Sequence, residues 1–253
     1  MRDLLPVHYF HVVFTLPSEL APLALQNQRL LYDLLFAAAS QTLTEIAGDA
    51  KHLGAELGFI AVLHTWGQSL QHHPHVHCVV PGGGLGRGGT EWVSTSPRFL
   101  LPVRVLSRVF RGKYLAGLRR LYEAGELTVA GQLAPLQSPR AFRALCRRLR
   151  KARLGRVHQA ALRRTRCRLE VLGALHPPRR HRQQPDPRRP PRRRDLPVQK
   201  AYRSGGTWRT MRLAPREFLR RFLLHVLPRG FVRIRHYGLL ANGCRRDKAP
   251  ALP

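Results

Sequence analysis

Residues 58–84, GFIAVLHTWGQSLQHHPHVHCVVPGGG, decide the fold. Residues 58–64 and 75–80 are short apolar runs bounded by polar and glycine-rich stretches, which predicts two neighbouring strands. The run PGGGLGRGG at 81–89 predicts a glycine-rich turn directly after the second strand. The sequence therefore predicts a sheet in which strand 75–80 follows strand 58–64.

The second strand carries His75 and His77 on either side of one apolar residue. Side chains i and i+2 of a strand point to the same face, so these two imidazoles can chelate one divalent cation. His64, at the end of the first strand, is a candidate third ligand. We expect His72 and His73 to lie in the loop between the strands.

The spacing of the histidines does not identify the metal, because imidazole binds several divalent ions. Magnesium or manganese is the expected cofactor. Such a cation polarises a phosphoryl oxygen while a phosphodiester is attacked. The alternative interpretation of an isolated H-x-H is a half-buried strand with incidental histidines.

Further elements flank this pair of strands. Residues 8–15 are aromatic and β-branched, which predicts another strand. Apolar residues recur at helical spacing over 23–47 without Gly or Pro, which predicts one long amphipathic helix. We also predict helices at 104–124, 138–151 and 215–227, the last with Pro215 in its first turn.

The chain is strongly basic. Its 253 residues include 44 Lys plus Arg against 14 Asp plus Glu, a formal net charge of +30. Such a charge favours a polyanionic partner, first of all DNA or RNA, with a ribosomal or membrane-surface protein as the alternative. The four cysteines form no C-x-x-C pair, and neither a signal peptide nor a membrane span is apparent, so we expect a cytoplasmic protein.

Residues 153–198 differ from the rest in composition. They hold 14 Arg, 7 Pro and no Lys. We expect no regular structure over 176–198, where prolines and like charges are dense, and helical pieces over 154–170. The simplest interpretation is a disordered basic linker that contacts phosphates.

Four blocks in order resemble the two-tyrosine HUH rolling-circle transposases of the insertion-sequence ninety-one group. They are LPVHYFHVVFTLP, the stretch 58–84, FLLPVRVLSRVFRGKYLAGL and EFLRRFLLHVLPRGFVRIRHYGLLAN. The resemblance covers roughly 4–150 and 200–243. It implies an α+β fold in which an antiparallel sheet carries the metal pair, matched here by His75 and His77, with helices packed against it.

The resemblance also implies a reaction. A tyrosine hydroxyl attacks a phosphate of single-stranded DNA, which leaves a 5′-phosphotyrosine link and a 3′-hydroxyl. Two tyrosines allow one active site to exchange two strands. DNA is therefore the expected partner, while the oligomeric state remains open.

The chain departs from this group in two ways. Members usually begin with a cysteine-rich zinc-binding region, and we expect the present chain to start after it. Members also carry a tyrosine pair in a YLGRY-like segment, and no Y-x-x-x-Y occurs here. Tyr237 is the spare candidate nucleophile, with a structural tyrosine as the alternative.

A shifted reading frame explains the missing pair. When the codons of Val171 to Leu175 are read one base later, VLGAL permits YLGRY, and the flanking residues also permit family-like sequence. We therefore interpret residues 152–199 as out-of-frame peptide between an HUH-like core at 1–151 and a C-terminal family segment at 200–253. A real basic linker is the alternative.

Three functions remain open. The chain is a transposase relative that has lost strand transfer, a non-catalytic nucleic-acid-binding protein, or a metal-dependent nuclease that uses water. The candidate DNA-binding residues are Arg111, Lys113, Arg119, Arg120, Arg220, Arg221, Arg233 and Arg235.

Overall fold

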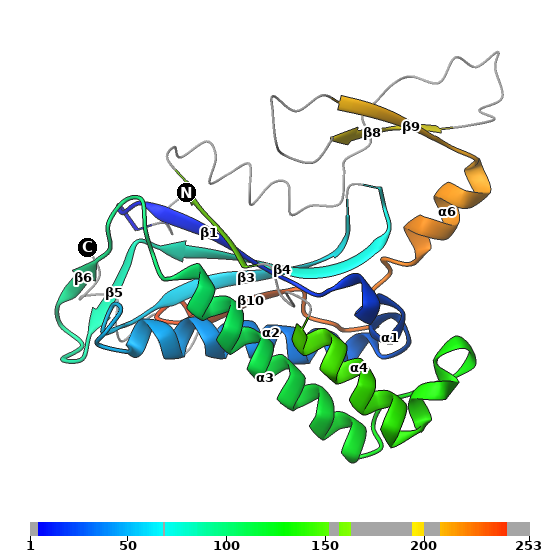
Figure 1. The fold of residues 1–253 in the computed structure, drawn as a ribbon. Coiled ribbons are helices and arrows are strands. Elements are labelled where there is room, and N and C mark those ends of the chain that lie inside the picture. Colours follow the sequence, from blue (N-terminus) through cyan, green and yellow to red (C-terminus); the bar gives the residue numbers. More distant parts are fainter. Residues whose placement is uncertain (1–4, 68, 152–156, 163–193, 200–207, 242–253) are drawn as a thin grey trace, which may run out of the picture.

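The computed structural model describes residues 5–67, 69–151, 157–162, 194–199 and 208–241. Its centre is a five-stranded antiparallel sheet in the order β10-β3-β4-β1-β7 (Figure 1). The bounds are β1 Tyr9–Thr15, β3 Gly58–Trp66, β4 His72–Pro81, β7 Val157–Leu162 and β10 Ile234–Gly238. The α+β fold class is confirmed.

Apart from α6, which lies beyond the end of the sheet, the helices cover one face of it (Figure 1). The bounds are α1 Ala21–Gln26, α2 Gln28–Gly48, α3 Val103–Glu123, α4 Pro139–Lys151 and α6 Pro215–Leu223, with 3-10 turns η1 Ser18–Leu20 and η2 Gly131–Gln137. The expected strands 8–15 and 58–64 and the helices 104–124 and 138–151 are confirmed. The helix expected at 215–227 begins at Pro215 as expected but ends at Leu223.

Alternation along the strands separates two faces. In β1, Phe10, Val12 and Phe14 are fully buried in the core shared with α2 and α3. In β4, Val76 and Cys78 belong to the same core. The residues between them, including His75 and His77 of β4, therefore point to the opposite face, which we call the open face.

The single helix expected over 23–47 is interrupted at Asn27, which has φ −124° and ψ 46°. The hydrogen bonds of its buried side chain explain the interruption. The amide Nδ2 donates to the carbonyl oxygens of Leu23 and Thr128, and Oδ1 accepts from the Thr128 backbone N–H at 2.7 Å. Hydrogen bonds to a segment 101 residues away thus favour the break over a continuous helix.

The glycine-rich stretch is more than a turn. Gly83–Gly86 forms β5, which pairs with β2 Ala55–Glu56 and β6 Trp92–Ser94 in a small second sheet. A Cβ atom at Gly84 would press against the backbone carbonyl of Glu56, so the close approach of β2 requires glycine there. The turn itself lies beyond β5, where Gly89 has φ +71°.

Two expectations for the arginine-rich segment are wrong where the structure describes it. Residues 157–162 form β7, a strand, where helical pieces were expected. β7 pairs with β1, and the side-chain amide of its Gln159 hydrogen bonds to the backbone of Leu101. Residues 194–199 form β8, which pairs with β9 Trp208–Leu213. The expectation of no regular structure over 176–198 is therefore wrong for residues 194–198. Residues 163–193 lie outside the described residues.

No helix among the described residues is long and apolar enough to cross a membrane.

The core between sheet and helices makes a direct prediction. Phe110 of α3 is fully buried, with its ring 5.0 Å from that of Phe14. We expect Phe110→Ala to lower the free energy of unfolding by about 3–5 kcal/mol, because it leaves a cavity among packed rings. Phe99 is 54% exposed, so Phe99→Ala is the matched control, with a change of at most about 0.5 kcal/mol. Urea denaturation of both variants measures the difference, and equal losses would show that α3 is not packed on the sheet as described.

Candidate metal centre

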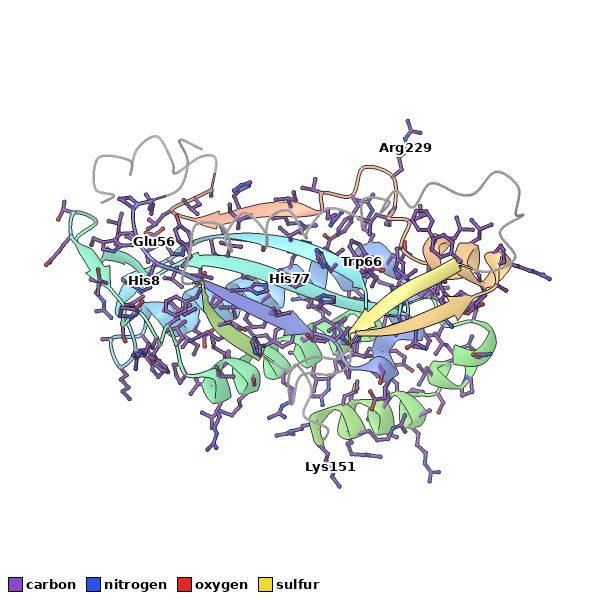
Figure 2. All side chains as sticks on the ribbon, turned by 90° about the horizontal axis from the view of Figure 1, so that it is seen from above. His8, Glu56, Trp66, His77, Lys151 and Arg229 are labelled. Atoms are coloured by element: carbon purple, nitrogen blue, oxygen red, sulfur yellow. The ribbon has the colours of Figure 1, made fainter. Side chains whose placement is uncertain are left out.

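Three histidines of β3 and β4 converge on the open face. The register pairs His64 with His75 and Val62 with His77, so all three imidazoles share one side of the sheet. One ligand nitrogen from each ring lies within 4.8 Å of the others. The ring centroids of His64 and His77 are 4.3 Å apart. Figure 2, seen from above, shows His77 near the middle of the sheet.

The chemistry of this cluster fits a metal ion. The Nε2 atoms of His64 and His77 are buried and have no hydrogen-bond partner among the described residues. A buried ring nitrogen without a partner costs about 1–3 kcal/mol. The Nδ1 atom of His75 lies 2.7 Å from the carbonyl oxygen of His73, which leaves its Nε2 available. A divalent cation would satisfy all three nitrogens at once.

The electrostatics hold these rings neutral. Burial, reinforced by the neighbouring His75 and by Arg233, lowers the pKa of His64 to about 3. Burial lowers the pKa of His75 to about 4, and burial together with His75 and His64 lowers the pKa of His77 further. All three are therefore neutral near pH 7, and neutral imidazole is the form that binds metals.

The structure adds neighbours that the sequence did not single out. His11 of β1 hydrogen bonds to the Nδ1 atom of His77 at 2.6 Å. Trp66, at the end of β3, stacks on His64 with centroids 4.7 Å apart. The Arg233 guanidinium lies 5.2 Å from the centroid of Trp66, which brings one candidate DNA-binding residue beside the triad.

His72 and His73 were expected in the loop, but both lie in β4. The His72 ring is held on two sides: its Nδ1 lies 3.1 Å from the Ala21 carbonyl oxygen and its Nε2 lies 2.8 Å from the Tyr32 hydroxyl. Because both nitrogens of His72 have partners, this histidine contributes to packing between β4 and the helices.

The other candidate DNA-binding residues lie apart from the triad. On the helix-covered side, Arg235 pairs with Asp33 of α2, and Lys113 pairs with Glu45 at 2.6 Å. On α6, Arg220 and Arg221 both contact Glu217. The remaining three are on α3: Arg111, Arg119 and Arg120. The structure thus brings only Arg233 of the eight to the histidines.

Tyr237 also lies away from the triad. In the β10–β3 register it is opposite Phe59, a core residue, and the two rings stack 5.2 Å apart. Its side chain packs against the core, and burial raises its pKa. Tyr237 therefore lies on the opposite side of the sheet from the histidine triad. Val171 and Leu175, the expected positions of the lost pair, lie outside the described residues.

Known proteins resemble this chain over most of its length. A family described as "Putative transposase" matches residues 58–174 and 194–248. A Sinorhizobium fredii protein named as transposase y4qJ is 47% identical over 249 residues, which is 97% of this chain and 62% of that protein. The transposase for insertion sequence element IS801 of Pseudomonas savastanoi pv. phaseolicola is 44% identical over 86 residues, 34% of this chain and 20% of that protein. No solved structure matches.

The family match includes both strands that carry the histidine triad, and Arg233, which directly precedes β10. The chain spans less than two thirds of the length of either relative. Within its own length, two separated ranges match in order, on either side of 175–193. The chain therefore belongs to this family of transposases.

Proposed function

We propose that this transposase binds single-stranded DNA at the open face of its sheet and holds one divalent cation with His64, His75 and His77. The observation that carries the proposal is the pair of buried, unpartnered Nε2 atoms that converge with a third imidazole. The HUH type of the sheet is part of the same proposal. A metal ion would account for the convergence of three neutral imidazoles, two of them with buried nitrogens that have no partner among the described residues.

The three nitrogen ligands limit which metal ions suit the site. Imidazole nitrogens suit transition metals such as zinc, iron and nickel, whereas magnesium prefers oxygen ligands. Manganese also suits oxygen ligands, but it belongs to the transition-metal series, of which it is the weakest binder. Of the two ions expected from the sequence, manganese fits this site better. When bound, such an ion would polarise a phosphoryl oxygen of the DNA. The chain's own residues hold the ligands neutral and place Arg233, a cation, beside the phosphate position.

The helical layer offers a second place for the DNA backbone. α4 carries six exposed basic residues and no acidic one: Arg140, Arg143, Arg147, Arg148, Arg150 and Lys151. Its apolar residues, among them Phe142 and Leu145, are buried instead. A helix with one face in the core and the other densely cationic is suited to phosphate contacts.

Strand transfer is the activity that we propose is lost. Among the described tyrosines other than Tyr237, Tyr114 is fully buried, Tyr32 contacts His72, and Tyr122 donates to the Gln137 carbonyl. Tyr9, at the start of β1, is buried and its hydroxyl accepts from the Leu5 backbone N–H. The proposed cause is the out-of-frame reading of 152–199. The family match leaves 175–193 unmatched, so it supports this cause only there, because 152–174 and 194–199 match the family in the frame as written.

Besides the family match over 152–174 and 194–199, a structural observation favours the alternative that the segment is native. β7 falls within it, pairs with β1 over six residues and bonds to the Leu101 backbone. In that case the chain is a non-catalytic DNA-binding protein with an intact sheet. The base sequence around codon 152 distinguishes the two, since an inserted or deleted base is visible directly.

We expect His77→Ala to reduce binding of Mn²⁺ or Co²⁺ at least 100-fold, because it removes one of three nitrogen ligands. Isothermal titration of the metal into the full chain measures this. His52 is exposed and distant from the triad, so His52→Ala is the control and should bind like the wild type. Equal affinities for the two variants would show that the ion binds elsewhere.

Binding of single-stranded DNA should weaken steeply with salt. Each phosphate contact contributes about 0.7 to the slope of log affinity against log salt. The double variant Arg143→Ala with Arg147→Ala should therefore lower that slope by up to about 1.4 in fluorescence anisotropy. Lys51→Ala with Arg87→Ala removes the same charge from exposed positions near β5, at the other end of the molecule (Figure 1), and serves as the control. Identical slopes in both double variants would exclude α4 as a contact surface.

Incubation with single-stranded DNA and Mn²⁺ should yield no covalent protein–DNA product, because no tyrosine described here lies at the triad. Denaturing electrophoresis with labelled DNA detects such a product. An adduct that disappears in Tyr237→Phe would overturn the proposed loss, and nicks without an adduct would instead indicate a nuclease that uses water. Restoring the reading frame should replace Val171 and Leu175 by tyrosines.

A further inference from the structure

His11 and His77 are in direct contact. Their rings are nearly parallel, at 9°, with centroids 4.8 Å apart, and His11 Nε2 lies 2.6 Å from His77 Nδ1. In the register of β1 and β4, His77 is opposite Val13, so His11 is its diagonal neighbour on the open face. Diagonal neighbours on one face of a sheet are within reach of long side chains.

The contact allows two tautomers, and metal ligation by His77 would select one of them. At this distance one nitrogen must donate and the other accept. His77 uses Nδ1 toward His11, while its Nε2 is the buried atom without a partner in the described part of the chain. A metal ligand needs a lone pair, so the proton of a ligating His77 must be on Nδ1, from which it is donated to His11 Nε2.

We propose that His11 is the positioning residue of this site: it accepts a hydrogen bond from Nδ1–H of His77 and thereby holds the His77 Nε2 lone pair toward the cation. The proposal rests on the metal site proposed above. His11 itself stays outside the ligand set, because its Nε2 is engaged by His77.

The arrangement has a chemical purpose. A ligating histidine that donates its second N–H to an acceptor has a fixed ring orientation and is a more basic ligand. Removal of such an acceptor typically weakens metal affinity 10–100-fold. His75 has a comparable partner in the carbonyl oxygen of His73, so two of the three ligands have a hydrogen-bond partner at Nδ1, the nitrogen that does not face the cation. His11 differs because it comes from another strand and joins β1 to the site.

Metal titration of the full chain tests the proposal with two variants. His11→Leu keeps much of the volume but removes the acceptor, and we expect Mn²⁺ and Co²⁺ affinity to fall 10–100-fold. His11→Gln places an amide oxygen near the position of Nε2, and its affinity should return to within about 5-fold of the wild type. His8→Leu is the control: His8 contacts Thr95 instead, and its loss should leave affinity unchanged.

The visible spectrum of bound Co²⁺ separates positioning from ligation. With His11 as a positioning residue, all variants keep the same number of nitrogen ligands and the same spectrum. Equal losses in the Leu and Gln variants, with a changed spectrum, would make His11 a ligand and overturn the proposal. Wild-type affinity in His11→Leu would overturn it as well.

A measurement without metal keeps the two proposals distinguishable. Long-range ¹H–¹⁵N correlation spectra of the apo protein report which ring nitrogen of His77 is protonated. We expect the proton on Nδ1 in the wild type and a shifted or mixed tautomer in His11→Leu. A proton on Nε2 in the wild type would overturn the role of His11, whereas absent Mn²⁺ and Co²⁺ binding would overturn the metal site alone.

Discussion

Antiparallel pairing of β3 with β4 places every ligand of the proposed site. The register sets His64 opposite His75 and Val62 opposite His77, and alternation then sends all three imidazoles to the open face. A slip of one residue would turn the histidines into the apolar core and expose Val76 and Cys78. The apolar alternation of β4 therefore stabilises the fold and orients the site through the same hydrogen bonds.

Much of this centre could be predicted from the sequence because it is local. The spacing of His75 and His77 defines a shared face in any strand, and the strand itself follows from its apolar residues. His64 could be named but not placed, since its position depends on the register. His11 lies in a strand that was also predicted, yet nothing in the sequence says which residue of β4 it meets. Strand pairing between distant segments is a tertiary property, which one sequence does not encode in readable form.

The incorrect expectations have the same origin. Periodicity over 23–47 favoured one helix, but the side chain of Asn27 binds the backbone of Thr128 and ends it. Composition favoured helical pieces after residue 153, but residues 157–162 pair with β1 at the edge of the sheet. Glycines suggested a turn where Gly84 allows β5 to approach Glu56. In each case a long-range contact outweighs a local preference.

The edge strand β10 affects how the protein is made. Arg233, just before β10, bonds to Leu63 of β3 across 170 residues. Ribosomes add about 5–20 residues per second, so β3 waits roughly 10–30 s for its outer neighbour. During that interval its unpaired N–H and C=O groups form an open edge that can pair with another nascent chain. Correct folding therefore depends on shielding of this edge until the C-terminal strand emerges, and the yield of folded protein should be sensitive to chaperone supply.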